Sequence, residues 1–405
     1  MMKIELSQQG DVRKLRSDGY NWNMNMSSGF FTRWGKTFGD DPDYGLPEIA
    51  DIEISEVCHG VRGVPCPFCY KSNVGYKGAN MSLDTYRTVI DNLLFLRQYV
   101  IKTTDGVMFY CSSDDDIITE DKQIIKVRDL IPGDVFVKDA LYTVDTIELK
   151  QESSLSQVAL GIGDIDGNPD LKEIILHTRK MGFVPNITIN GDRLTDEWVD
   201  FFSKNLGAIA VSVYDKELSY NAIKRLTDAG MTQCNIHFMV SVQTEDMVYE
   251  IMNDTQTDPR LEKLNALVLL SLKQKGRGEN FNKLPQDNFT KIVQYGMEKG
   301  VGFGFDSCSA FRFLKSVEGH KDYDMFKMMT EPCESTCFSM YINTHGDFYP
   351  CSFTENTEEW ETGLTLADKN IDFLRDIWFH PRVVKVRRDI IKTRKACKSC
   401  FYFDV

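Results

Sequence analysis

The feature that most restricts the fold is a series of short apolar segments that alternate with helical patterns from Gln157 onward. These segments are residues 157–161, 186–190, 208–214, 235–241, 266–272 and 301–305. Strands that alternate with helices predict a parallel sheet with helices on its outside. Together with an earlier apolar run at residues 48–54, the segments predict an α/β fold with six or seven parallel strands.

Small or polar residues stand where these apolar segments end. They are Cys58, Gly163, Asn190, Ser212, Ser241, Lys273 and Asp306. The carboxyl ends of parallel strands meet at one edge of a sheet or barrel, and catalytic residues of such folds gather there. We therefore expect a functional site at this edge.

Three cysteines follow the first apolar run within twelve residues. Seven residues separate Cys58 from Cys66, and two separate Cys66 from Cys69. The glycines and prolines between them let the backbone curl, so that three sulfurs converge on one point. A structural zinc site closes with four ligands, whereas a four-iron cluster on three cysteines leaves one iron open. The three cysteines alone leave a zinc or purely structural site and an iron-sulfur site as alternatives.

Eight of the eleven cysteines fall in two groups, and the second group lies near the C-terminus. Its members are Cys333, Cys337, Cys351, Cys397 and Cys400. In a reducing compartment, cysteines are more often metal ligands or reactive thiols than disulfides. Gly346 lies between Cys333 and Cys351 and predicts a hairpin with one thiol on each side. An iron-sulfur cluster and a four-cysteine zinc site both remain open here.

The first cysteine group resembles that of the radical S-adenosylmethionine (SAM) enzymes, in which three cysteines follow the first strand of a parallel barrel. An aromatic residue before the last cysteine is part of that pattern, and Phe68 supplies it. The commonest spacing in the family is three residues and then two, so the first gap here is longer. The resemblance covers most of residues 46–405 outside an insert. It implies a partial (β/α)6 TIM-like barrel with a small C-terminal cluster-binding domain and a small β insert.

By this resemblance, a [4Fe-4S] cluster on the three cysteines binds SAM and cleaves it reductively to a 5'-deoxyadenosyl radical, which takes hydrogen from a substrate. Gly161, Gly163 and Asp164 match the turn that holds the methionyl amino group, with Asp in place of the usual Glu. Asn190 and Ser212 would face the ribose and methionine portions of SAM. Each of these residues could also be an ordinary turn or strand-end residue.

A basic loop at residues 273–278 follows the strand predicted at residues 266–272. Its lysines and arginine could grip a carboxylate of SAM or of the substrate by charge-assisted hydrogen bonds. A solvated loop is the alternative. His237 lies within an apolar segment, and a core histidine is favoured there over a ligand.

The C-terminal region resembles the start of the SPASM and twitch extensions, which carry auxiliary iron-sulfur clusters in peptide-modifying radical SAM enzymes. A full SPASM domain has more cysteines after the hairpin than this chain supplies, so one auxiliary, twitch-like [4Fe-4S] cluster fits better. Its implied ligands are Cys333, Cys351, Cys397 and Cys400, with Cys337 and Cys308 as possible substitutes. The resemblance favours a peptide or protein substrate over a small molecule. It also implies an electron donor such as flavodoxin or ferredoxin.

About sixty residues separate the helix predicted after Ser82, its N-cap, from the next strand, which indicates an insertion. Residues 99–152 show alternating apolar residues and a Pro-Gly turn, which predict a small β unit. This segment resembles the beginning of a Hint (hedgehog and intein) domain, with Cys111 at the place of the splicing nucleophile. The insert has no His to assist an acyl shift, and no Asn precedes Ser154 or Ser156. We therefore interpret it as a degenerate remnant without splicing chemistry.

These features predict an N-terminal cap at residues 1–45 with one hairpin, a core barrel at 46–318 interrupted by the insert at 99–152, and a cluster domain at 319–405. The net charge of -13 argues against non-specific binding to nucleic acid or to anionic membranes. There is no apolar run of 18 residues and no signal segment at the N-terminus, so we expect a soluble, cytoplasmic protein. The competing hypothesis is a non-catalytic zinc or iron-sulfur scaffold with a Hint-derived module.

Overall fold

The computed structural model describes residues 4–27, 30–38, 40, 45–73, 75, 77–112 and 115–395. The chain forms two compact units. Unit 1 comprises Met1–Leu46 and Asp91–Ser156, and unit 2 comprises Pro47–Ile90 and Gln157–Val405.

Unit 2 is built on a ten-stranded sheet, in which seven neighbouring strands are parallel. They are β5 (Ile49–Glu53), β12 (Gln157–Gly161), β13 (Val184–Ile189), β14 (Ala208–Ser212), β15 (Cys234–Val240), β16 (Ala266–Ser271) and β17 (Phe303–Phe305). Their order in the sheet is their order in the chain, as the strand-helix alternation predicts. Among the described strands, β17 pairs only with β16, so the sheet does not close into a barrel.

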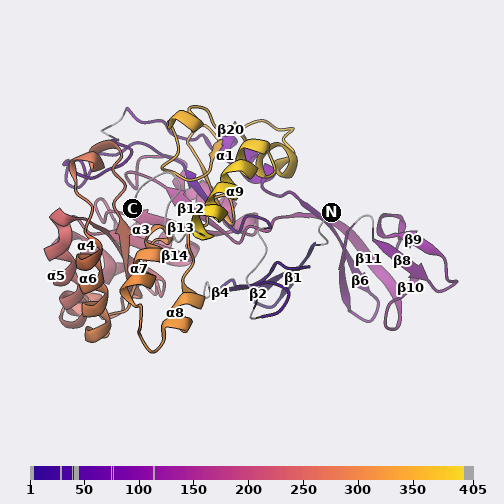
Figure 1. Cartoon of the computed structure of the whole chain (residues 1–405). Coiled ribbons are helices and arrows are strands. Elements are labelled where there is room, and N and C mark those ends of the chain that lie inside the picture. The colour runs from indigo at the N-terminus through magenta and orange to yellow at the C-terminus, as the bar shows by residue number, and fades with distance from the viewer. Residues whose placement is uncertain are drawn as a thin grey trace. The chain divides into compact units, whose positions relative to one another are not determined.

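Helices connect the parallel strands of unit 2. They are α1 (Leu83–Asn92), α2 (Leu171–Lys180), α3 (Asp196–Asn205), α4 (Lys216–Asp228), α5 (Glu245–Thr257) and α6 (Gln286–Lys299), followed by α7 (Ala310–Ser316) and α8 (Tyr323–Met329). Figure 1 shows α4, α5 and α6 side by side on the outside of this unit. The predicted N-cap of α1 is confirmed, because the Ser82 hydroxyl accepts the Thr85 N–H at 3.1 Å.

The C-terminal region extends the same sheet on the other side of β5. Strand β18 (Ser339–Ile342) pairs in parallel with β5, forms a hairpin with β19 (Asp347–Tyr349), and is followed by β20 (Leu364–Thr365) on β19. Gly346 has a φ of +82° in the hairpin turn, which only glycine adopts without strain. The glycine hairpin predicted from the sequence is therefore confirmed. A π-helix (Phe373–Trp378) and α9 (Pro381–Lys395) follow it.

The first part of unit 1 is a four-stranded antiparallel sheet. Its strands are β1 (Ile4–Gln9), β2 (Val12–Ser17), β3 (Asn21–Asn25) and β4 (Phe31–Trp34). The prediction of a single hairpin here was wrong. Tyr20, Trp22 and Met24 are fully buried at every second position of the β3 segment. Asparagines between them, which are depleted in strands, obscured this period.

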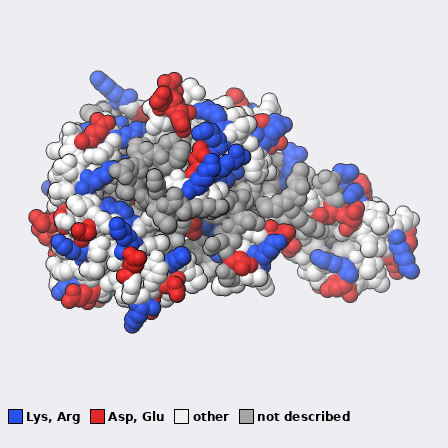
Figure 2. All heavy atoms as spheres, viewed as in Figure 1, with Lys and Arg blue, Asp and Glu red and all other residues white. Residues whose placement is uncertain are grey.

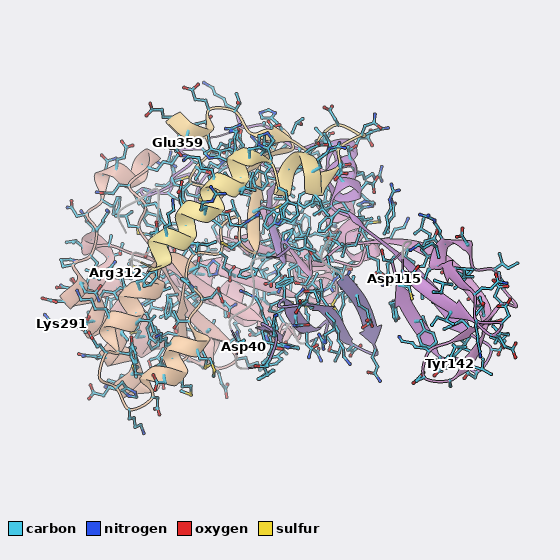
Figure 3. The ribbon with its side chains drawn as sticks, turned by 45° about the vertical axis from the view of Figure 1, so that its right-hand side comes forward. Asp40, Asp115, Tyr142, Lys291, Arg312 and Glu359 are labelled. Atoms are coloured by element: carbon cyan, nitrogen blue, oxygen red, sulfur yellow. The ribbon has the colours of Figure 1, made fainter. Side chains whose placement is uncertain are left out.

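The second part of unit 1 is a six-stranded sheet. It contains β6 (Leu96–Thr103), β7 (Met108–Cys111), β8 (Asp116–Thr119), β9 (Ile124–Lys126), β10 (Val135–Val137) and β11 (Leu141–Glu152). Tyr142, labelled in Figure 3, packs 4.7 Å from the Phe109 ring, and its hydroxyl donates to Asp139 at 2.9 Å. Cys111 ends β7 opposite Tyr99, and its side chain packs against the apolar core of this sheet.

The surface carries both signs of charge. On the face shown in Figure 2, Lys and Arg lie among Asp and Glu wherever atoms are described. The net charge of -13 is therefore not gathered into one acidic region of that described surface. None of the helices in the described ranges is long and apolar enough to cross a membrane.

One buried side chain ties together the elements that lead to the carboxyl edge of the sheet. The amide nitrogen of Asn168 donates to the carbonyls of Ile54 at 2.7 Å and Met81 at 2.9 Å. Its amide oxygen accepts the N–H of Asp170 at 2.9 Å. Asn168 thus joins the end of β5 and the approach to α1 to the loop between β12 and α2.

Replacing this side chain should weaken unit 2. We expect Asn168→Ala to lower the free energy of unfolding by about 2–4 kcal/mol, because the three hydrogen bonds of this buried side chain are lost. Urea denaturation followed by circular dichroism measures the change. The matched control is Asn221→Ala, whose amide donates to Glu217 on the exposed surface of α4. Equal effects of the two substitutions would contradict this role of Asn168.

Candidate functional site

A cavity of about 750 Å³ lies along the parallel strands of unit 2. Its lining includes alternate residues of three strands: Asn186 and Thr188 on β13, with Asn190 just past its end, Ala208, Ala210 and Ser212 on β14, and Asn235, His237 and Met239 on β15. In a closed (β/α)8 barrel, bulky branched side chains fill this space. Here small and polar side chains leave it open, so a ligand can lie against the strands themselves.

The cavity brings together most of the residues that the sequence singled out. They are Cys58, Cys66, Phe68, Cys69, Gly161, Gly163, Asn190, Ser212, Cys333 and Cys351. Cys308 also lines it, whereas Cys337 is fully buried and does not. Cys397 and Cys400 lie outside the described residues. Thiols from distant parts of the sequence therefore face one cavity.

A tight hairpin takes up the long gap between the first two cysteines. In residues 61–64, the backbone groups of Val61 and Val64 exchange hydrogen bonds of 2.9 and 3.0 Å. The two central residues have positive φ, +51° and +81°, as a type I′ turn requires. Four of the seven residues between Cys58 and Cys66 form this closed hairpin. The other three residues span the distance between the two cysteines. The long gap in the sequence thus corresponds to a short path in the structure.

Asp164 holds the cysteine loop. Its carboxylate accepts the His59 N–H at 3.0 and 3.2 Å and also binds the imidazole Nδ1 of that residue. Asp164 is buried and does not line the cavity, so its predicted contact with SAM stays a prediction. The preceding residue must be glycine, because a Cβ on Gly163 would lie 2.5 Å from the Cβ of Cys58 and 2.2 Å from the Val57 carbonyl oxygen.

The three thiols share one electrostatic environment. Burial raises the pKa of Cys58 and of Cys66, and each is also coupled to Cys69. A bound metal reverses this effect, because a coordinating thiol is deprotonated. In the described ranges no three His, Cys, Asp or Glu side chains are grouped closely enough to hold one metal ion. By its chemistry, the donor set of three thiols on one loop at one cavity is of the kind that holds an iron-sulfur cluster.

Aromatic rings close the cavity beside these thiols. The Phe68 ring stacks on Tyr214 at 5.4 Å and meets Phe281 edge-on at 5.6 Å. The Tyr214 hydroxyl is hydrogen-bonded to the Cys66 sulfur. Phe68, predicted from the motif, therefore forms an apolar wall next to the cysteines.

Arg277, in the loop that follows β16, binds the cysteine loop. Its Nε donates to the Cys66 carbonyl at 2.8 Å, and its backbone N–H donates to the Cys69 carbonyl at 3.0 Å. Gly276 permits this close approach, because a Cβ there would lie 2.5 Å from the Tyr70 carbonyl oxygen. These contacts show that the loop is not simply solvated, whereas its predicted grip on a carboxylate of SAM or of the substrate stays a prediction.

The two lysines of the same loop are also bound within the protein. Lys273 forms an ion pair of 2.5 Å with Asp306 at the end of β17. Burial alone would lower the pKa of Lys273, but this ion pair outweighs burial and raises it. Lys275 donates to the carbonyls of Phe353 at 3.0 Å and Glu355 at 2.5 Å. The loop therefore connects the cysteine loop, β17 and the C-terminal hairpin region.

A buried ionic network was missed at the sequence level. Lys71 donates to Glu53 at 2.9 Å and to the Tyr341 hydroxyl at 2.7 Å, and it also pairs with Glu355. The side chains of Lys71, Glu53 and Glu355 are only 12%, 9% and 9% exposed. Asn343 donates to the second oxygen of Glu355 at 2.8 Å. The available signal was the alternation of acidic and apolar residues in β5, which places its acids on one face.

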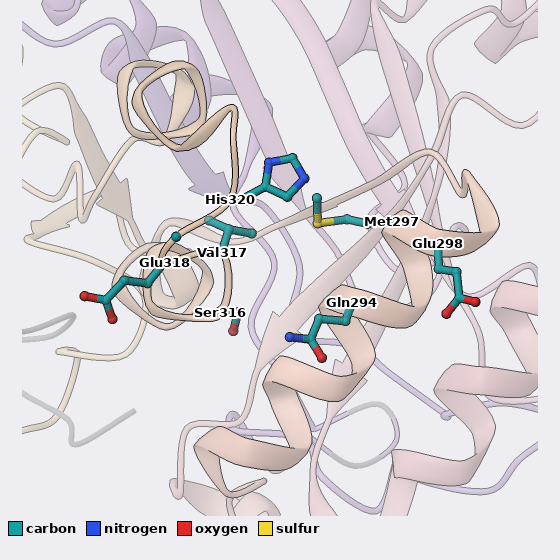
Figure 4. Close-up of a pocket in the computed structure, with 8 residues that line it drawn as sticks. Gln294, Met297, Glu298, Ser316, Val317, Glu318 and His320 are labelled. Carbon is teal, nitrogen blue, oxygen red and sulfur yellow. The ribbon is translucent and has the colours of Figure 1, made fainter.

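A second cavity, of about 470 Å³, lies between α6 and the turn that follows α7 (Figure 4). Its lining consists of Gln294, Met297, Glu298, Ser316, Val317, Glu318, Gly319 and His320. None of the predicted site residues lines it. The candidate site is therefore the larger cavity.

One family model matches the C-terminal region of the chain. Residues 333–401 match the SPASM family, described as an iron-sulfur cluster-binding domain. The match assigns iron-sulfur clusters as the cofactor of the C-terminal region, and its range includes the undescribed Cys397 and Cys400. No curated protein sequence matches the chain significantly.

Solved structures show a shared fold. Streptococcus suis SuiB superposes with a TM-score of 0.54 at 13% identity, over 85% of this chain and 68% of that chain. Native anSMEcpe with bound AdoMet and Cp18Cys peptide superposes with a TM-score of 0.50 at 12% identity, over 84% of this chain and 82% of that chain. At these identities the likeness establishes the α/β architecture of the chain.

The contacts of Arg277 generate a prediction that needs no metal. We expect Arg277→Gln to raise the rate of iodoacetamide alkylation at Cys66 and Cys69 about tenfold or more. Hydrogen bonds from a charged donor contribute roughly 1.5–3 kcal/mol, and their loss favours local opening of the loop. Mass spectrometry of the cysteine peptides measures the rates, with buried Cys234 as internal reference. Lys291→Gln on α6 is the matched control, and equal rates in both variants would show that Arg277 does not restrain the loop.

Proposed function

We propose that the protein is a radical SAM enzyme that binds a [4Fe-4S] cluster on Cys58, Cys66 and Cys69 and modifies a peptide or protein. The single observation that carries this proposal is the meeting of that loop with the glycine turn at Gly161–Gly163 in one cavity beside a parallel sheet. The fold shared with AdoMet-bound anSMEcpe supports it. SAM is accordingly the co-substrate that we assign to the cavity.

When bound, such a cluster supplies an electron to the SAM sulfonium and so generates the radical that removes hydrogen from the substrate. The chain's own residues orient and shield the reactants. Phe68 and Tyr214 exclude water from the thiol side of the cavity. The backbone at Gly161 and Gly163 leaves room for the methionyl group, because neither residue extends a side chain. Ser212, half-buried at the end of β14, faces SAM in this proposal.

Asn190 has a second role in the proposed site. Its amide nitrogen donates to the Gly60 carbonyl at 3.2 Å, and its oxygen accepts the Asp192 N–H at 2.9 Å. It therefore joins the end of β13 to the cysteine loop while lining the cavity. We assign Asn190 to the SAM site through this position.

The C-terminal region holds one auxiliary [4Fe-4S] cluster in this proposal, in a twitch-like arrangement. Its ligands are Cys333, Cys351, Cys397 and Cys400, and Cys308 is the substitute that the cavity favours, because it lines the cavity and Cys337 does not. We further propose a partial (β/α)6 core at residues 46–318 and a cluster domain at 319–405. Residues 1–45 form a cap, and the Hint-like insert at 99–152 is a β appendage without splicing activity.

The substrate is a peptide or protein in this proposal. The peptide bound to anSMEcpe supports this class, and the cavity, at about 750 Å³, is large enough for several side chains. An electron donor such as flavodoxin or ferredoxin supplies the reducing electron. The deciding experiment is anaerobic reconstitution with iron and sulfide, followed by metal analysis and an assay for 5'-deoxyadenosine. About eight irons per chain with SAM cleavage supports the proposal, whereas zinc with intact SAM refutes it.

Removal of a proposed ligand tests the first cluster. We expect Cys66→Ala to abolish 5'-deoxyadenosine formation, because two thiols cannot hold the cluster with one open iron. The fold should persist, since Cys66 is only partly buried. Cys111→Ala, in unit 1, is the control and should keep the activity. Formation of 5'-deoxyadenosine by Cys66→Ala would refute the ligand assignment.

Removal of a C-terminal thiol tests the second cluster. We expect Cys351→Ala to lose about four irons per chain and the corresponding absorption, while the iron held by the first three cysteines remains. Iron analysis and visible absorption of the reconstituted variant measure this loss. An unchanged iron content would show that Cys351 is not a ligand.

A further inference from the structure

One carboxylate in the cavity has no role in the proposed chemistry. Asp51 lies in the middle of β5, between Ala50 and Ile52, which are fully buried. The strand is bordered on one side by β12 and on the other by β18. The Asp51 side chain is nevertheless exposed, and it lines the cavity. Its exposure is therefore exposure to the cavity.

The other charged groups of the cavity wall are already paired. The charged residues in the lining are Asp51, Glu53, Lys71, Lys273 and Asp306. Lys71 is bonded to Glu53, and Lys273 is bonded to Asp306. Within the described ranges, no hydrogen bond or ion pair to the Asp51 side chain is formed. Among the residues that the structure describes, Asp51 is thus the carboxylate of this wall that lacks a cation.

The surroundings of Asp51 increase its demand for a positive charge. Although the side chain faces the cavity, it is enclosed by protein; this burial and then the neighbouring Glu334 carboxylate raise the pKa of Asp51 to about 7. His237, across the cavity wall on β15, does not supply a charge, because burial lowers its pKa to about 4. A cation beside Asp51 would offset both the desolvation and the repulsion.

The residues paired with Asp51 leave space for such a cation. Ala159 lies directly opposite it on β12, and Tyr341 lies opposite it on β18. Neighbouring strands of a sheet lie about 4.8 Å apart, so both residues are neighbours of Asp51 on one face. Ala159 fills little of this space, and Tyr341 adds an aromatic ring of the kind that binds cations. The Tyr341 ring already has the Lys71 ammonium 5.1 Å from its centroid.

We propose that Asp51 anchors a subsite for a cationic group of the substrate, a primary ammonium or a guanidinium. The inference rests on the proposed function in that it names the substrate class of the same cavity: a peptide or protein that presents a lysine, an arginine or an amino terminus. An organic cation fits better than a divalent metal ion, which requires several oxygen ligands. Either cation donates charge-assisted hydrogen bonds to the carboxylate.

The experiment measures the binding of three probes to the full-length, anaerobically reconstituted protein. The probes are n-butylammonium, n-butylguanidinium and 1-butanol, titrated by saturation-transfer difference NMR. We expect the two cations to bind at least about tenfold more tightly than butanol, and Asp51→Asn to remove this difference. Asp84→Asn is the matched control, because the Asp84 side chain is 94% exposed on α1. Cation binding that survives in Asp51→Asn overturns the proposal.

A second measurement uses only the wild-type protein, so it tests the proposed cation subsite even if Asp51→Asn does not fold. Carbodiimide coupling to glycinamide labels accessible carboxyl groups, and mass spectrometry reads the labelling of Asp51. We expect n-butylguanidinium, but not butanol, to suppress this labelling about tenfold at saturation. Equal labelling with either probe overturns the proposal, as does equal affinity of the wild-type protein for cations and butanol.

The two proposals can fail separately. If the wild-type protein does not form 5'-deoxyadenosine but binds n-butylammonium through Asp51, the proposed function is wrong and the subsite stands. If it cleaves SAM but shows no preference for cations, the subsite is wrong and the proposed function stands.

Discussion

The site depends on one buried ammonium group. Burial of a lysine is unfavourable unless the charge is paired, and breaking such a pair leaves an uncompensated charge in the interior. Lys71 follows Cys69 by two residues and meets Glu53 at the end of β5 and Glu355 beyond the C-terminal hairpin. These carboxylates lie 18 and 284 residues away in the chain. If the cysteine loop moved away from the sheet, Lys71, Glu53 and Glu355 would lose their ion pairs, and buried charges would remain without a partner.

The basic loop at residues 273–278, after β16, also joins separate segments of the chain through its positively charged side chains. Alternate residues, Lys273, Lys275 and Arg277, each bind a different neighbouring segment. Because these three residues occupy every second position, one short loop contacts β17, the C-terminal region and the cysteine loop. All of these cations are therefore engaged in holding the walls of the cavity together. Asp51, on the same wall, has no such cation among the described residues, and this is the position that we propose a cationic group of the substrate occupies.

The alternation of strands and helices was sufficient to predict the order of the parallel strands and the edge at which the site lies. Periodicity reports which face of an element is buried, but not which distant residue a polar side chain meets. The pairing of Lys71 with Glu355 therefore could not be predicted, and neither could the contact of Arg277 with Cys66. Similarly, the glycine motif located Asp164 but not its rotamer, which points to His59. The N-terminal sheet was missed because asparagines interrupt its apolar period.

Small residues at alternate positions of two strands indicate in the sequence that the cavity is open. Ala159 and Gly161 on β12, with Ala208 and Ala210 on β14, are small residues at alternate positions that face the cavity. Replacing any of them by a branched residue would fill space that a packed barrel fills with such side chains. Small residues on two strands thus leave the volume of the cavity open, and a carboxylate on a third, without a partner among the described residues, sets the charge of its wall. The strands that hold the cysteine loop at their ends therefore also form, along their length, the wall of the cavity next to it.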